Sequence, residues 1–109
     1  MDTRSTVTLA SAASANGNYP SSGAVQLAGG PYQVFVTGVI DATVKVQLSS
    51  DNSNFYTPTN MTFTSTSVDY SLEVGRGVYA RAVISSVGSP SPAITVELVP
   101  IPEAGVIFR

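Results

Sequence analysis

The sequence predicts an all-β protein, an antiparallel β-sandwich of about eight strands with an immunoglobulin-like or a jelly-roll topology. Apolar and polar residues alternate along most of the chain, which is the pattern of a strand with one buried face. Clusters of glycine, proline and asparagine interrupt this alternation every ~8 to 12 residues. No segment carries the apolar stripe of an amphipathic helix, and the small residues at 10–15 are too rich in serine to form one.

Each predicted strand is a run of alternating residues that ends at a turn-forming residue. In order, the strands are expected at 6–10, 24–27, 32–40, 43–49, 61–64, 68–74, 78–84 and 93–99. Because successive side chains of a strand point to opposite faces, every second residue shares a face. The apolar sets that share a face are Val7 and Leu9; Val25 and Leu27; Tyr32, Val34 and Val36; Val44, Val46 and Leu48; Val68, Tyr70, Leu72 and Val74; and Ile94, Val96 and Leu98.

Two connections between the strands have informative compositions. Residues 11–22 contain an Asn-Gly-Asn run and a proline, which predicts a loop. Residues 50–54 are Ser, Asp, Asn, Ser and Asn, whose short side chains can bond to their own backbone in a turn. A calcium loop needs acidic ligands at several alternating positions, and here only Asp51 is charged. The segment is therefore predicted to be a turn with no bound metal.

The composition lacks the side chains on which most catalysis depends. The chain has no histidine and no cysteine, and only 5 basic and 7 acidic residues among 109, with a net charge of −2. Transition-metal sites, general acid–base pairs and activated nucleophiles draw mainly on His, Cys and clustered carboxylates. We therefore expect a protein that is not an enzyme and has no catalytic residue, cofactor or metal. The scattered basic residues also predict no binding to nucleic acid.

The length is that of one domain. We expect a single β-sandwich over 1–109, with an extended N-terminal segment at 1–22 and a C-terminal tail at 100–109. The N-terminus lacks the apolar run of a signal peptide, and no stretch approaches the ~18 apolar residues of a membrane helix. These features predict synthesis in a cytoplasm and no membrane partner.

Three places carry candidate assembly contacts. Val7 and Leu9 lie in the N-terminal segment, and Tyr79 and Arg81 share a strand face with Val83, a mixture that protein interfaces favour. A routine outer sheet face would explain Tyr79 and Arg81 equally well. The tail contains an apolar triplet that could join a neighbouring subunit by strand addition or fold back over its own sheet. The triplet is Val106, Ile107 and Phe108.

Exposed tyrosines offer an alternative that belongs to a different functional class. Their rings combine an apolar face with a polar hydroxyl, so they can stack on sugars. Tyr32, Tyr56 and Tyr79 are the candidates for such a carbohydrate- or receptor-binding surface. Most aromatic residues of a small sandwich instead fill its core or its interfaces.

Four segments stand in a recognisable order: TVTLASAA at 6–13, VKVQLSSDNSNF at 44–55, GVYARAV at 77–83 and SPSPAITV at 89–96. Together they resemble small virion proteins of tailed bacteriophages, whose members show a V-x-L-Q-x-S-x-D-G-x-x-W hairpin, a G-x-Y-x-R strand and a closing S-P-x-x-T-V strand. The chain departs from that pattern at two places. Asn52 and Ser53 stand where Asp-Gly is usual, and Phe55 stands where Trp is usual.

This resemblance implies a non-enzymatic β-sandwich in a phage particle. The function expected from it is decoration, or cementing, of the capsid exterior, so that the protein is located in the virion. The implied partners are the major capsid protein and further copies of the chain in a homo-oligomer. A tail, baseplate or fibre component and the carbohydrate- or receptor-binding module remain as alternatives.

Overall fold

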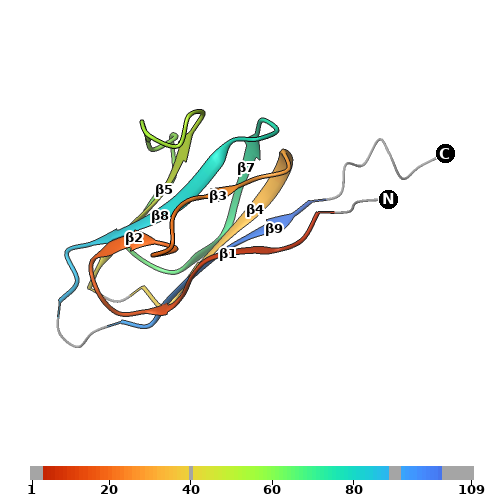
Figure 1. Ribbon diagram of the computed structural model, residues 1–109. Helices are drawn as coiled ribbons and strands as arrows, with labels where there is room; N and C mark the ends of the chain where they lie inside the picture. The colour runs from red at the N-terminus through yellow and green to blue at the C-terminus, as the bar shows by residue number, and fades with distance from the viewer. Residues whose placement is uncertain (1–3, 40, 89–91, 102–109) are drawn as a thin grey trace.

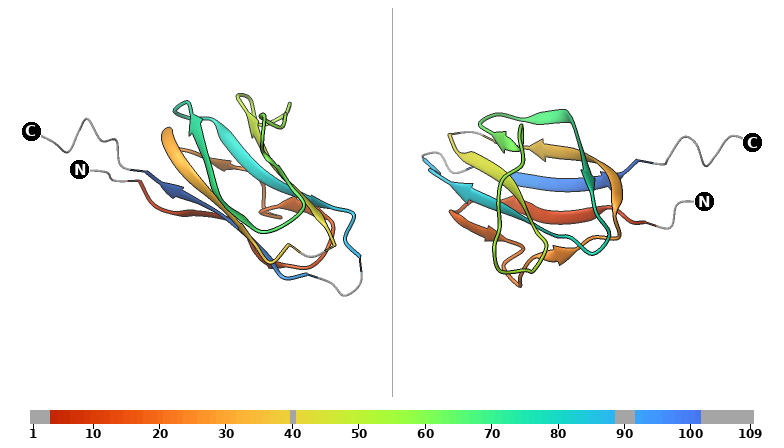
Figure 2. Two further views of the ribbon diagram at one scale, coloured as in Figure 1. Left: turned by 180° about the vertical axis from the view of Figure 1, so that it is seen from behind. Right: turned by 90° about the horizontal axis from the view of Figure 1, so that it is seen from above.

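The computed structural model describes residues 4–39, 41–88 and 92–101. Within these ranges the chain forms strands and no helix, and so offers no helical span for a membrane. Two antiparallel sheets lie face to face, which confirms the predicted all-β sandwich (Figure 1, Figure 2). The strands are β1 (Val7–Ala13), β2 (Gly17–Tyr19), β3 (Val25–Gln26), β4 (Gly30–Thr37), β5 (Thr43–Ser49), β6 (Thr62–Phe63), β7 (Ser67–Val74), β8 (Tyr79–Ser85) and β9 (Ile94–Pro100).

The strand pairing identifies a jelly roll. We call the sheet with the order β1-β9-β4-β7 sheet A, and the sheet with the order β2-β8-β5-β6, in which β3 also pairs with β8, sheet B. The pairs β1 with β9, β2 and β3 with β8, β4 with β7, and β5 with β6 are nested, as in one long hairpin. The pairs β4 with β9 and β5 with β8 roll this hairpin into two sheets.

The same order excludes the immunoglobulin-like alternative. In that fold the first two strands are neighbours in one sheet. Here β1 lies in sheet A and β2 lies in sheet B, and each pairs with a strand from the C-terminal part of the chain.

The core lies between the two sheets and follows the predicted alternation. All of the predicted inward-facing residues of β4, β5 and β9 are at most 7% exposed. Burial of one such side chain contributes about 1.5 to 3 kcal/mol, so these central strands carry much of the stability. The core residues of β4, β5, β8 and β9 are Tyr32, Val34, Val36, Val44, Val46, Leu48, Ala80, Ala82, Ile84, Ile94, Val96 and Leu98.

The edge strand β7 departs from the alternation in its first half. Its pairing with β4 shifts because Tyr70 lies opposite Val34 while Ser67 lies opposite Val36, so β7 contains one extra residue. Val68 is therefore out of phase with Leu72 and is only half-buried. Tyr70 is 42% exposed. Its ring packs edge-on against the buried Phe63 of sheet B, at 5.7 Å between ring centroids.

The prediction of a loop over 11–22 was wrong for half of that segment. Strand β1 continues to Ala13, and β2 occupies Gly17–Tyr19. β2 has only 3 residues, which is too short to show an alternating pattern. Its backbone pairing with β8 holds it in sheet B. Its anchor is Tyr19, whose ring packs against the core and whose hydroxyl donates a hydrogen bond to the Ala15 carbonyl at 2.7 Å.

Arg4 fixes the segment that precedes β1 to the end of β9. Its guanidinium donates hydrogen bonds to the carbonyls of Gly29 at 3.1 Å, Pro31 at 2.8 Å and Ile101 at 2.7 Å. It also lies over the ring of the buried Tyr32, 5.0 Å from the centroid. These contacts hold the N-terminal residues from Arg4 onwards against the sandwich.

Candidate functional site

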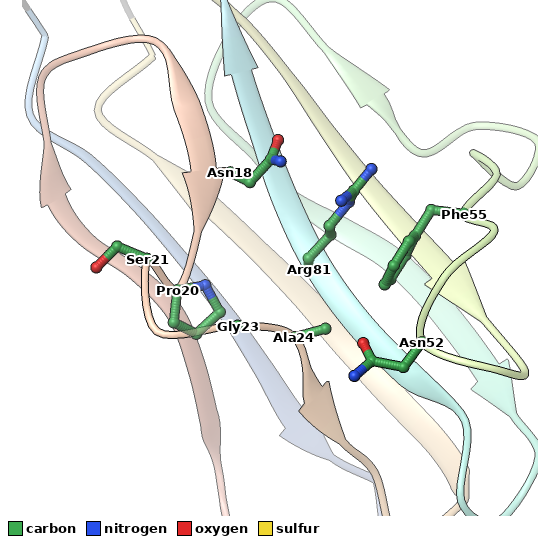
Figure 3. A pocket seen from close by; sticks show the side chains of 8 residues that line it. All are labelled: Asn18, Pro20, Ser21, Gly23, Ala24, Asn52, Phe55 and Arg81. Atoms are coloured by element: carbon green, nitrogen blue, oxygen red, sulfur yellow. The ribbon is translucent and has the colours of Figure 1, made fainter.

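The outer face of sheet B carries a hollow of about 260 Å³. One wall is the end of β2 and the turn that follows it, and the other wall is the turn between β5 and β6. Arg81 of β8 lies between the two walls, with Asn18 on one side and Phe55 on the other (Figure 3). We call this hollow the Arg81 pocket. Its lining residues are Asn18, Pro20, Ser21, Gly23, Ala24, Asn52, Phe55 and Arg81.

The wall that contains Asn52 and Phe55 is shaped by one carboxylate. Oδ1 of Asp51 accepts hydrogen bonds from the backbone N–H groups of Ser53 and Asn54, both at 2.9 Å. The buried Ser49 hydroxyl also donates to Oδ1 at 2.8 Å, and the amide of Asn54 donates to Oδ2 at 3.0 Å. The predicted turn, in which polar side chains bond their own backbone, is thus confirmed. Asn52 occupies the left-handed region at φ 61°, which asparagine tolerates well.

These hydrogen bonds favour the ionised form of the carboxyl group. The backbone N–H of Asn54, then that of Ser53, then the side chains of Ser49 and Asn54 hold the pKa of Asp51 well below its usual range. Since the folded pKa lies below the unfolded value of about 3.9, the resulting stabilisation is complete above that value. It is lost as the pH falls through the folded pKa.

We expect Asp51→Ala to lower the thermal midpoint at neutral pH, because the turn loses its acceptor for two backbone donors. The deficit relative to the unchanged chain should be constant from about pH 7 to about pH 5 and should shrink below about pH 4. Thermal melts followed by circular dichroism across this range measure it. Ser53→Ala is the matched control, since the exposed Ser53 side chain makes no hydrogen bond to described residues. A deficit independent of pH would contradict the role of the ionised carboxylate.

Arg81 is held in place by two neighbours. Its Nε donates a hydrogen bond to Oε1 of Gln47 at 3.0 Å, from the position directly opposite on β5. The Gln47 amide in turn donates to Oγ1 of Thr57 at 3.1 Å, which fixes its orientation. The guanidinium lies over the ring of Phe55, 3.9 Å from the centroid. Among the described residues, nothing accepts a hydrogen bond from the Nη1 and Nη2 groups of Arg81.

The opposite wall is a tight turn between β2 and β3. The Tyr19–Pro20 peptide bond is cis, and the N–H of Gly23 donates to the Pro20 carbonyl at 3.0 Å. Asn18 lies opposite Val83 in the pairing of β2 with β8, so its side chain belongs to the outer face of sheet B. The wall thus contributes the amide of Asn18 to the pocket, while the hydroxyl of Ser21 points away from Arg81 (Figure 3).

The structure places the predicted contact residues in different surroundings. Tyr79, Arg81 and Val83 share the outer face of sheet B as predicted, and all three are half-buried. Leu9 is 2% exposed and lies in the core. Val7 is partly buried and packs against that core, because it lies opposite Leu98 in the pairing of β1 with β9.

The prediction that the side chain of Leu9 anchors the protein to another subunit is therefore corrected, because this side chain stabilises the protein's own core. Val7 is half-buried on the edge strand β1 and stays a predicted contact. The predicted tail contacts at Val106, Ile107 and Phe108 lie outside the described residues.

The exposed tyrosines differ in part from the predicted set. Tyr56 is 62% exposed and Tyr70 is 42% exposed, whereas Tyr32 is 1% exposed in the core. Tyr32 cannot contact a sugar in this fold, which corrects that prediction. Tyr56 is held at the surface by two backbone hydrogen bonds with Leu48, of 3.0 and 3.1 Å.

The sequence interpretation missed the residues that complete the Arg81 pocket. Asn18 and Ser21 lie in a segment predicted to be a loop, Asn52 lies in the predicted turn at 50–54, and Phe55 follows that turn with no predicted contact. The sequence signal for the pocket was Gln47, which the alternation of its strand places on the outer face. In the structure Gln47 lies directly opposite Arg81, so their side chains meet. No cluster of three or more His, Cys, Asp or Glu residues able to hold a metal occurs in the described part of the chain.

Comparison of the chain with models of protein families, with curated proteins and with solved structures gives no match. The candidate site is therefore defined by its geometry: a hollow in which uncharged side chains, two of them amides, surround one oriented guanidinium group.

Proposed function

We propose that the chain is a non-enzymatic structural protein of a phage virion and that it decorates and stabilises the capsid. The observation that carries the proposal is the outer face of sheet B. Hydroxyl, amide and apolar side chains make up this face, and its only cations from the paired strands are Lys45 and Arg81. Another protein can cover such a face while removing few charges from water, which keeps the desolvation cost low.

Two further considerations support this function. The segments at 44–55 and 77–83, which resemble small virion proteins of tailed phages, contribute the floor and one wall of the Arg81 pocket. The jelly roll is an architecture of viral capsid proteins, although it also serves lectins, so the fold alone does not decide the function. The partners we propose are the major capsid protein and further copies of the chain.

Mass action would supply the stabilisation. A protein that binds the assembled capsid lattice and not its dissociated subunits shifts the equilibrium toward the lattice. The rigid sandwich needs little ordering on binding, so little of the contact free energy is lost.

Deletion of the gene for this chain tests the proposal. We expect particles to assemble without the protein and to release their genome at a lower temperature or on chelation of divalent ions. Adding back the purified chain should restore heat resistance. Equal resistance of particles with and without the chain would contradict the proposal.

The exposure of Tyr56 and Tyr70 favours one other candidate, a carbohydrate- or receptor-binding module. A glycan array probed with the purified chain would detect it. Binding that disappears in Tyr56→Ala or Tyr70→Ala, and persists in the control Ser53→Ala, would support this candidate. An array without signal would count against it.

A further inference from the structure

We propose that the Arg81 pocket receives one carboxylate group, supplied by an acidic side chain of a neighbouring protein subunit. The identity of that neighbour as a virion subunit rests on the function proposed above. The binding chemistry of the pocket is derived from the described residues alone.

The first argument is charge. Arg81 is the only ionisable residue that lines the pocket, and it forms no ion pair within the described chain. Asp51 lies next to Asn52 in the sequence, but its oxygens accept hydrogen bonds from the turn itself. The pocket therefore presents one positive charge that the described residues leave uncompensated. A single negative charge on the ligand would balance it.

The second argument is orientation. The bond from Nε to Gln47 and the contact with the Phe55 ring fix the plane of the guanidinium. The Nη groups remain available, and a guanidinium can bind both oxygens of a carboxylate through parallel hydrogen bonds. The neighbouring side chains already order Arg81. Its side chain therefore loses less conformational entropy when a ligand binds than the side chain of a free arginine would.

The third argument is the size and polarity of the hollow. A pocket of about 260 Å³ accommodates a side chain of the size of aspartate or glutamate. The amides of Asn18 and Asn52 line it together with Arg81, whereas the hydroxyl of Ser21 points away from the guanidinium (Figure 3). One cation among neutral hydrogen-bonding groups suits a singly charged carboxylate better than a phosphate, which carries more charge and attracts several basic residues.

The aromatic surroundings favour a protein ligand over an acidic sugar. Sugars stack on an open aromatic face, whereas the guanidinium of Arg81 covers one face of Phe55 at 3.9 Å. The two most exposed tyrosines, Tyr56 and Tyr70, do not line the pocket.

A nuclear magnetic resonance titration of the isolated chain tests the inference. The probe is N-acetyl-aspartate amide, a blocked residue with one carboxylate, and N-acetyl-asparagine amide is its uncharged counterpart. We expect saturable shifts of the Arg81 Nε–H and of the side-chain amides of Asn18 and Asn52, with a dissociation constant of about 1 to 10 mM. The uncharged counterpart should cause no saturable shift.

Variants separate the pocket from general charge effects. Arg81→Gln should weaken binding at least about tenfold, and Arg81→Lys should weaken it severalfold because it loses the paired donors. Asn18→Asp keeps Arg81 but places a competing carboxylate on the pocket wall, so it should also weaken binding. Lys45→Gln is the matched control: it removes the other cation of the same sheet face without touching the pocket, and binding should change less than about twofold.

The outcomes are distinct from those for the proposed function. Absence of binding by the unchanged chain, equal binding by Arg81→Gln, or preference for D-glucuronate or inorganic phosphate over the blocked aspartate would overturn the inference. None of these results depends on whether the chain occurs in phage particles. Saturable binding of the blocked aspartate that depends on Arg81 would support the carboxylate-binding role of the pocket, whatever the result of the gene deletion.

Discussion

Replacing Leu98 with alanine is expected to lower the free energy of unfolding by about 3 kcal/mol. Leu98 is 0% exposed on the central strand β9 and lies between Val7 of β1 and Val34 of β4. Truncation removes three buried carbons and leaves a cavity that both neighbouring strands help to enclose. Because these strands are held by pairing on both sides of β9, the cavity can collapse only in part.

Thermal and urea melts followed by far-ultraviolet circular dichroism measure this effect. A loss of about 3 kcal/mol corresponds to a fall of about 15 °C in the thermal midpoint for a domain of this size. Val99→Ala is the control, because Val99 is the next residue of β9 and points to the outer face. We expect it to cost about 1 kcal/mol or less. Equal losses for the two variants would contradict the assignment of the inner face of sheet A.

Gly38→Ala is expected to destabilise the protein by about 3 kcal/mol. Gly38 follows β4 with a φ of 76°, a left-handed conformation that alanine disfavours. An added Cβ would overlap the backbone carbonyl oxygen of Ala93, just before β9. The N–H of Gly38 also donates to Oγ1 of Thr66 at 3.2 Å, so the residue lies close to both neighbouring segments. A backbone obstacle cannot rotate away, and either β4 or β9 must shift.

Gly75→Ala provides the comparison for this prediction. The two substitutions reduce the flexibility of the unfolded chain equally, so their difference reports strain in the folded state. At Gly75 the φ is ordinary, and a new Cβ would meet only the Val78 side chain at 3.5 Å, a normal contact distance. Its effect should lie within about 0.5 kcal/mol of zero. Comparable stabilities of Gly38→Ala and Gly75→Ala would show that β4 does not end as described.

The alternation of residues predicted the central strands well because their burial is local in origin. In β5, for example, Val44 and Val46 are 0% exposed, as their spacing of two predicted. The pattern failed at edges, where pairing alone determines the strand: β2 has no alternation, and one extra residue in β7 moves Val68 out of phase. The choice of a jelly roll depends on which distant strands pair, and the turn signals of the sequence contain no such information.

The candidate site was predictable only in part for the same reason. The shared face of Tyr79 and Arg81 follows from their spacing within one strand. The Arg81 pocket instead requires the turn after β2 to approach the turn after β5 across β8, which lies between those two strands in sheet B. Leu9 was wrongly predicted to be a surface contact, because the sequence of an N-terminal strand does not show that it will pair with β9 and turn one face toward the core.

The most direct test of the central claim is to quantify the chain in purified phage particles by mass spectrometry. A capsid decoration protein repeats with the lattice, so we predict on the order of hundreds of copies per particle. A count from a few to about tens would instead place the chain in the tail or baseplate. Particles that contain none of it would contradict the account.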